Sequence, residues 1–211
     1  TYLNGLASIP DGGITIEVTA GQVFTENAMT IHQVLGTAGS PVIFQKSGTG
    51  DNPVVKNADP DADGVFVIYL SEFISFDGID ITDTDPSDEN RYYRGFYINA
   101  SDNISIVNCN ISDFNKYGIH SRYESANITL DHNEIFHSPD YTTSESSVYG
   151  IYTAYNSEAD NITVTSNKVY GLKYATSTVY GIRVGQVNSM VANNFIAITA
   201  DGNDKIYGLR M

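Results

Sequence analysis

Side chains suited to ligand binding recur at one place in a repeated pattern. Five segments share a tetrapeptide with a central glycine: Arg94-Gly95-Phe96-Tyr97, Tyr117-Gly118-Ile119-His120, Tyr149-Gly150-Ile151-Tyr152, Tyr180-Gly181-Ile182-Arg183 and Tyr207-Gly208-Leu209-Arg210. We expect the last residue of each to face outward, in a column that Arg122 and Tyr123 extend. Aromatic rings stack on sugar faces, and planar polar groups hydrogen-bond hydroxyls. We therefore predict a glycan-binding surface, with an ordinary solvated face as the alternative. Its candidate ligand-binding residues are Tyr97, His120, Arg122, Tyr123, Tyr152 and Arg183.

A second column is formed by the tyrosine that opens four of these tetrapeptides. Its members are Tyr117, Tyr149, Tyr180 and Tyr207. Each lies two residues from an aliphatic residue that we expect to face inward, so period-2 alternation predicts that the tyrosine ring packs inward or at a bend. We expect a structural stack of rings here, and the neighbouring glycine permits close backbone approach.

A candidate calcium loop lies earlier in the chain. Asp59, Asp61 and Asp63, followed by Gly64, match positions 1, 3, 5 and 6 of a calcium-binding loop. Leu70 stands where such a loop carries its bidentate glutamate at position 12, so this is not an EF-hand. Carboxylate ligands on a very acidic chain predict Ca²⁺ as the cofactor, and a solvated acidic turn is the alternative.

The elements that position these residues are short strands. A second repeated unit consists of Asn103-Ile104-Ser105-Ile106, Asn127-Ile128-Thr129-Leu130, Asn161-Ile162-Thr163-Val164 and Asn188-Ser189-Met190-Val191. Its alternation of apolar and polar residues has the period of a β-strand. Short strands that repeat every few tens of residues cannot bury their apolar faces alone, and stacked coils solve this problem. The pattern predicts an all-β, right-handed parallel β-helix, with an antiparallel sandwich as the alternative.

An asparagine ladder is the sharpest indication of stacked coils. The sixth position after the repeat asparagine holds Cys109, Asn133, Asn167 and Asn194. Stacked amides hydrogen-bond one another along the axis and satisfy the backbone at a tight bend, and asparagine tolerates the left-handed conformation that such bends need. We expect Cys109 to cap this column as a buried, inert thiol.

The repeats predict a single β-helix domain over residues 1–211. Residues 1–70 form irregular first coils and residues 71–211 form the regular repeats. Because the chain ends just after it opens a new repeat, we interpret it as a fragment of a longer protein, whose remaining chain stacks at the C-terminal end.

The charge balance excludes one class of partner. The chain has 25 Asp and Glu against 11 Lys and Arg, a net charge of −14. Such a chain repels phosphate backbones, so we expect no nucleic acid partner. No apolar run approaches the roughly 18 residues of a membrane span, so we expect no membrane span either.

The chain also resembles a known group of proteins. The segment from Gly36 to Val55, GTAGSPVIFQKSGTGDNPVV, closely resembles the opening of secreted β-helix regions in large surface proteins of Bacteroidetes-type bacteria. The later Asn-Ile and Tyr-Gly-Ile repeats resemble the parallel β-helix of the pectin-lyase-like superfamily. This resemblance implies export by the type IX secretion system, with the protein secreted or at the cell surface.

The resemblance is weaker for activity, because superfamily members include lyases, hydrolases, adhesins and plain stalks. A polysaccharide lyase would need a basic residue that abstracts the proton α to a carboxylate of the sugar. The catalytic candidates for this role are His120, Arg122 and Arg183. We expect instead an exported module for adhesion or glycan contact that is not a self-sufficient enzyme. The alternatives are a lyase or glycoside hydrolase with an incomplete groove, and a passive structural stalk or secretion cargo domain.

Overall fold

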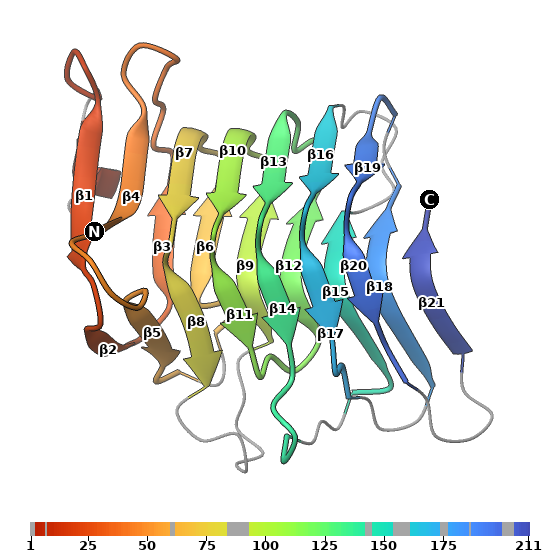
Figure 1. Cartoon of the computed structure of the whole chain (residues 1–211). Helices are drawn as coiled ribbons and strands as arrows, with labels where there is room; N and C mark the ends of the chain where they lie inside the picture. Colours follow the sequence, from red (N-terminus) through yellow and green to blue (C-terminus); the bar gives the residue numbers. More distant parts are fainter. Residues whose placement is uncertain are drawn as a thin grey trace.

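Short strands stack into successive coils along the whole chain. The computed structural model describes residues 3–6, 8–59, 62–83, 93–141, 145–153, 161–173, 177–185, 187–199 and 205–211. Within these residues, every coil contributes to three parallel sheets of seven strands each. Figure 1 shows the coils following one another from the N-terminus at one end to β21 at the other. The predicted parallel β-helix is confirmed, and the antiparallel sandwich is wrong.

The three sheets are named here by their order within a coil. Sheet A contains β1 (Ile14–Thr19), β4 (Val42–Ser47), β7 (Glu72–Asp77), β10 (Asp102–Val107), β13 (Ile128–Asp131), β16 (Ile162–Thr165) and β19 (Met190–Ala192). Sheet B contains β2 (Val23–Glu26), β5 (Val54–Asn57), β8 (Asp80–Asp83), β11 (Asn110–Ser112), β14 (Glu134–Phe136), β17 (Lys168–Tyr170) and β20 (Phe195–Ala197). Sheet C contains β3 (Met29–His32), β6 (Phe66–Tyr69), β9 (Arg94–Asn99), β12 (Tyr117–Arg122), β15 (Ser147–Thr153), β18 (Thr178–Val184) and β21 (Lys205–Arg210). A short 3₁₀ helix, η1 (Leu3–Gly5), precedes the first coil.

The core fills the space that the three sheets enclose. Its first coils are aromatic: the rings of Phe44 and Phe76 stack with centroids 4.8 Å apart, and those of Phe66 and Phe96 with centroids 5.2 Å apart. Later coils place isoleucine, leucine and valine in the same columns. Alternate strand residues point inward, so the apolar positions that the repeat predicts become the buried ones.

The predicted asparagine ladder runs along the bend between sheets A and B. Asn133 Nδ2 donates to Asn167 Oδ1 at 3.0 Å, and Asn167 Nδ2 donates to Asn194 Oδ1 at 3.0 Å. Each amide oxygen also accepts a hydrogen bond from the backbone N–H of the preceding rung. At the start of the ladder, the backbone N–H of Cys109 donates to Asn133 Oδ1 at 3.0 Å. Burial raises the pKa of the Cys109 thiol to about 12, so the thiol stays protonated and inert, as expected.

The left-handed bend itself lies one residue earlier than the ladder. Positive φ occurs at Asn108, His132, Ser166 and Asn193, each directly before a ladder position. The expectation that the ladder asparagines themselves adopt this conformation is therefore wrong. They serve as hydrogen-bonding groups, and the preceding residue makes the turn. The repeat asparagines Asn103, Asn127, Asn161 and Asn188 do have positive φ.

A serine ladder serves the same purpose between sheets C and A. Ser71 Oγ accepts the N–H of Val34 at 3.1 Å, and Ser101 Oγ accepts the N–H of Ser71 at 3.1 Å. Ser125 Oγ accepts the N–H of Ser101 at 3.2 Å. All three serines are buried, so these bonds satisfy backbone donors that water cannot reach.

Candidate ligand-binding face of sheet C

The outer face of sheet C carries a continuous stack of tyrosine rings. Tyr117, Tyr149, Tyr180 and Tyr207, called here the tyrosine ladder, are paired across successive strands. Successive ring centroids lie 5.0, 4.6 and 4.8 Å apart, and the last two pairs of rings are almost parallel. The predicted aromatic stack is confirmed, and its rings follow the spacing of the strands.

The rings face outward rather than inward because of the glycine that follows each tyrosine. A Cβ on Gly118 would lie 2.7 Å from Cγ2 of the core residue Ile135, so the glycine faces the interior. The next residue, Ile119, is fully buried. Two neighbouring residues therefore face the core, which leaves Tyr117 and His120 together on the outside, with ring centroids 4.2 Å apart. The predicted inward packing of the tyrosines is wrong for this reason.

The column predicted to bind a ligand lies directly beside the tyrosine ladder. Its members are Tyr97, His120, Tyr152, Arg183 and Arg210, called here the mixed row, and they are paired across β9, β12, β15, β18 and β21. The rings of His120 and Tyr152 lie 5.1 Å apart, and those of Tyr149 and Tyr152 lie 4.9 Å apart. Because the two rows pack against each other, the side chains cover one another. The expected exposure is wrong for Tyr97 and His120, which are only 7% and 3% exposed.

Arg94 anchors the buried end of this face. Its Nε donates to His120 Nδ1 at 2.9 Å, and its Nη1 donates to Asp63 Oδ1 at 3.0 Å. Its guanidinium lies over the ring of Tyr97, 4.3 Å from the centroid. Sequence reasoning did not select Arg94 as a site residue. The available signal was that arginine replaces the tyrosine of the other four tetrapeptides, since Arg94 is paired with Tyr117.

His120 is neutral in this environment. Burial is the largest cause that lowers its pKa, to about 3, and the positive charges of Arg94, Arg122 and Lys116 act in the same direction. Its Nδ1 accepts the hydrogen bond from Arg94, so the ring proton resides on Nε2. The lone pair that a general base needs is therefore already engaged, which weighs against His120 as the base of a lyase.

The cations at the surface of this face lie against tyrosine rings. Arg122 is exposed and lies 4.5 Å from the ring centroid of Tyr123, which is 46% exposed. Arg183 is half-buried and lies 5.0 Å from the ring centroid of Tyr152. Arg210 is exposed, and its Nη1 donates to Tyr180 Oη at 3.2 Å. These contacts hold guanidinium groups at the surface while leaving donors available to a ligand.

Positive charge is concentrated here although the chain as a whole is acidic. Six of the 11 Lys and Arg residues lie in sheet C or directly before one of its strands. These six are Arg94, Lys116, Arg122, Arg183, Lys205 and Arg210. Burial alone would lower the pKa of Lys116, but hydrogen bonds with Tyr93 and Glu145 outweigh it and raise that pKa. Burial raises the pKa of Tyr117 to about 12, so this rung of the tyrosine ladder is neutral.

The predicted calcium loop is only partly described. Asp61 lies outside the described residues. Asp63 pairs with Arg94 at 3.0 Å, and a cation at this carboxylate would have to compete with that arginine. Within the described residues, no group of three His, Cys, Asp or Glu side chains is placed to hold a metal ion. Calcium binding by Asp59, Asp61 and Asp63 stays a prediction.

Comparison with known proteins places the chain in a family. The model of the right handed beta helix region matches residues 51–207, most of the chain, so the protein belongs to that family. The crystal structure of an alginate lyase from Paenibacillus sp. str. FPU-7 has a TM-score of 0.53 and 11% sequence identity, and the match covers 99% of this chain and 96% of that one. At this identity the likeness shows the fold alone.

Two further observations add no indication of function. A search of curated proteins finds no match to this chain. Among the described residues, no helix has the length and hydrophobicity that crossing a membrane requires. The type IX secretion pathway and the bacterial group are not tested by these comparisons and stay predictions.

Proposed function

We propose that this β-helix domain binds an acidic polysaccharide along the outer face of sheet C and is not a self-sufficient enzyme. The observation that carries the proposal is the tyrosine ladder, flanked by Arg122, Arg183 and Arg210 on a chain of net charge −14. Because the rings of the ladder stack on one another, they present their edges and hydroxyl groups to a ligand, and tyrosine hydroxyls can hydrogen-bond the hydroxyls of a sugar. Guanidinium groups form paired hydrogen bonds with carboxylates, and the carboxylates of an acidic polysaccharide would be recognised in this way.

The spacing of the ladder supports a ligand that lies along the helix axis. Successive tyrosine rings are 4.6 to 5.0 Å apart. A pyranose unit of a polysaccharide has a comparable length, so a chain along the axis meets about one ring in each coil. Each contact is weak, and affinity comes from several contacts that act together.

Binding without cleavage is favoured by the state of His120. Among the predicted catalytic candidates, His120 is the usual general base, yet its Nδ1 is engaged by Arg94 and its side chain is buried. Arg122 and Arg183 carry guanidinium groups, which stay protonated and suit charge recognition better than proton abstraction. Export to the cell surface, where such a domain would serve adhesion, is part of the same proposal.

The direct test is calorimetry with purified protein and oligosaccharides of equal length, one acidic (oligo-alginate) and one neutral (a cello-oligosaccharide). We expect the acidic ligand to bind and the neutral one to bind at least tenfold more weakly. The double variant Arg122→Ala/Arg183→Ala should lose most of the binding. The matched control, Lys168→Ala/Lys173→Ala, removes the same charge from two exposed lysines outside sheet C and should bind as the wild type does.

Three outcomes would contradict the proposal. Equal loss in the control variant would mean that only net charge matters. No binding of either ligand would favour the passive stalk. An increase in unsaturated-sugar absorbance during incubation with alginate, absent in a His120→Gln variant, would establish the lyase alternative instead.

A further inference from the structure

We propose that a groove along the bend between sheets C and A binds an extended segment of a partner protein that is both basic and apolar. The groove has a volume of about 670 Å³, and the residues that line it include Leu35, Leu70, Glu72, Ala100, Asp102 and Glu124. Most of these residues lie on the second, third and fourth coils, so the groove is on the side of the molecule and not at one of its ends. It shares no lining residue with the tyrosine ladder or the mixed row, and this proposal therefore does not rest on glycan binding.

The serine ladder creates this groove. At the bend of each of the first four coils, one residue with positive φ turns the chain inward: Gln33, Leu70, Ala100 and Tyr123. In the second and third coils the next residues are the buried Ser71 and Ser101, after which the chain emerges at Glu72 and Asp102. The serines are therefore the floor between two outward rows of side chains. Ala100 is the one small member of the first row, so the groove is open there.

Large apolar side chains gather in the open along this bend. Among the described residues from 24 to 186, the exposed large hydrophobic side chains are those of Leu35, Tyr69, Leu70 and Tyr123. All four lie at this bend or directly before it. Leu35 and Leu70, which line the groove, are 59% and 38% exposed. An exposed apolar patch of this kind marks a surface that another molecule contacts.

The same groove is acidic. Glu72, Asp102 and Glu124 line it, and none of these three carboxylates forms an ion pair with another described residue. The nearest cation along the chain, Arg122, lies against the ring of Tyr123 instead. This charge is opposite to that of the outer face of sheet C, so the two surfaces select different ligands.

Glu124 is an added residue at this bend. Leu70 and Ala100 are each followed directly by a serine of the ladder, whereas Glu124 separates Tyr123 from Ser125. Ser125 still accepts the N–H of the preceding rung, so the insertion leaves the ladder intact. The extra glutamate is exposed and adds a carboxylate to the groove.

A lysine or arginine side chain matches both properties of the groove, because its methylene stem is apolar and its head is charged. The stems would lie on Leu35 and Leu70, and the heads would reach the three carboxylates. The backbone at the bend is already paired, since Glu72 N donates to Val34 O and Asp102 N donates to Ser71 O. The partner segment therefore lies across the coils and does not extend a sheet. Four coils at about 4.8 Å span about 14 Å, the length of about four extended residues.

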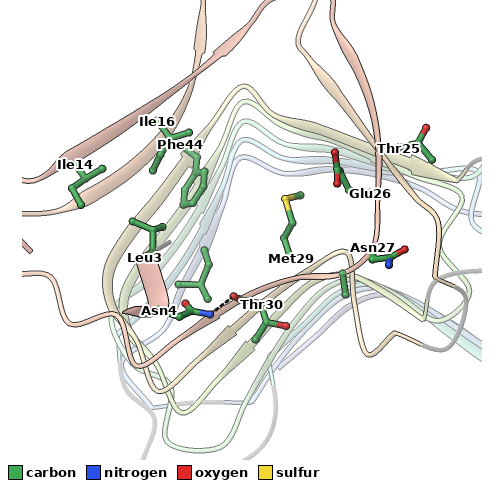
Figure 2. A pocket seen from close by; sticks show the side chains of 12 residues that line it. Leu3, Asn4, Ile14, Ile16, Thr25, Glu26, Asn27, Met29, Thr30 and Phe44 are labelled. Carbon is green, nitrogen blue, oxygen red and sulfur yellow. Dashed lines mark hydrogen bonds between the residues drawn. The ribbon is translucent and has the colours of Figure 1, made fainter. Parts of the chain in front are cut away.

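The open interior at the N-terminal end is a different feature. A cavity of about 950 Å³ lies within the first coil, and Figure 2 shows Ile16, Met29 and Phe44 around it. These side chains pack against the hydrophobic core, so the cavity belongs to the packing of the β-helix. Of the described residues that line it, Glu26 alone is charged, which does not favour a basic segment.

Fluorescence anisotropy with labelled pentapeptides tests the proposal. We expect acetyl-KLKLK-amide to bind, acetyl-KSKSK-amide to bind at least tenfold more weakly because it lacks the apolar contact, and acetyl-ELELE-amide not to bind. Glu72→Gln/Glu124→Gln removes two carboxylates at nearly constant size and should weaken binding of the first peptide at least tenfold. The matched control, Glu17→Gln/Glu26→Gln, removes the same charge from exposed glutamates outside the groove and should bind as the wild type does.

A further variant tests the apolar contact separately from charge. Leu70→Asn keeps a residue type that tolerates the positive φ of this position. It should weaken binding of acetyl-KLKLK-amide and leave that of acetyl-KSKSK-amide unchanged. Circular dichroism establishes that each variant is folded.

Three results would overturn the proposal. Equal loss in the Glu17→Gln/Glu26→Gln control, or equal affinity for the two lysine peptides, would mean that only net charge matters. Competition by spermine at the same concentration as acetyl-KLKLK-amide would mean that the groove takes any polyamine. No binding of acetyl-KLKLK-amide at any concentration would leave the groove to another occupant, such as a further segment of a longer polypeptide.

Discussion

The asparagine ladder illustrates, at the scale of single residues, how this fold satisfies its buried backbone. Asn167 Nδ2 donates both to Asn194 Oδ1 and to Leu130 O, and Asn167 Oδ1 accepts from the side chain and the backbone of Asn133. One fully buried side chain therefore satisfies groups from both neighbouring coils. A residue without an amide would leave those groups unpaired, at a cost of about 1–3 kcal/mol for each.

Replacement of Asn167 by leucine should therefore lower the free energy of unfolding by roughly 1–3 kcal/mol or more. Urea unfolding followed by circular dichroism measures this change. Asn194→Leu, at the partly exposed last rung, should cost less because water can reach the groups it leaves. Equal losses at both positions would mean that burial does not determine the strength of the ladder.

Gly118 is a second residue whose type follows from its surroundings. A Cβ there would lie 2.6 Å from Gly150 O and 2.7 Å from Ile135 Cγ2, and a backbone oxygen within a sheet cannot move aside cheaply. We expect Gly118→Ala to destabilise by about 1–3 kcal/mol, as overpacked cores do. Gly39→Ala, where nothing lies within 4 Å, is the control and should change stability little. A neutral Gly118→Ala would contradict the inward orientation of this glycine.

At the scale of the strand, the two rows on sheet C explain what could and could not be predicted from the sequence. The strands, the coils and the ladder positions follow from period-2 alternation and from identical residues at identical steps. The outward turn of the tyrosines does not, because strict alternation places Tyr117 and Ile119 on the same face. Their separation depends on an inward glycine, which is seen only when the neighbouring coil is in place.

The burial of His120 was missed for a similar reason. Its cover comes from residues of other strands, Arg94 on β9 and Tyr152 on β15, so no single stretch of sequence contains it. The exposed members Arg122 and Tyr123 were predicted as surface residues, and they are exposed. The exposure of a side chain on this face therefore depends on its neighbours on adjacent strands, which are distant in the sequence.

The buried imidazole of His120, which lies in this face of sheet C, makes the stability of the protein depend on pH. The pKa of His120 is lowered from its ordinary value of 6.5 to about 3 when the protein folds. Between these values the unfolded chain binds a proton that the folded chain does not, so acidification favours unfolding. From pH 7 to pH 4 this costs about 3 kcal/mol of folding free energy.

A His120→Gln variant, which cannot titrate but retains an acceptor for Arg94, should lose stability less steeply between pH 7 and pH 4 than the wild type. Urea unfolding at several pH values gives both slopes. Parallel slopes would show that His120 is protonated in the folded protein as readily as in the unfolded one.

At the scale of the whole molecule, the length of the tyrosine ladder sets the size of the ligand. Its four rings lie on four successive coils. We expect the affinity for acidic oligosaccharides to rise with each added sugar until the ladder is covered, at about four or five units, and then to level off. Calorimetry with a size series measures this. Affinity that is already maximal for a disaccharide would place the site in a single coil.

The orientation of the backbone hydrogen bonds has a mechanical consequence. In all three sheets these bonds join one coil to the next, so they point along the axis of the molecule. A force applied between the two ends pulls them open one coil at a time instead of shearing them together. Steps of 24 and 34 residues between ladder rungs would each release about 80 to 120 Å of chain. Under tension the molecule would lengthen in increments at low force, as an extensible tether does, and single-molecule stretching would record a series of small peaks whose spacings follow the unequal lengths of the coils.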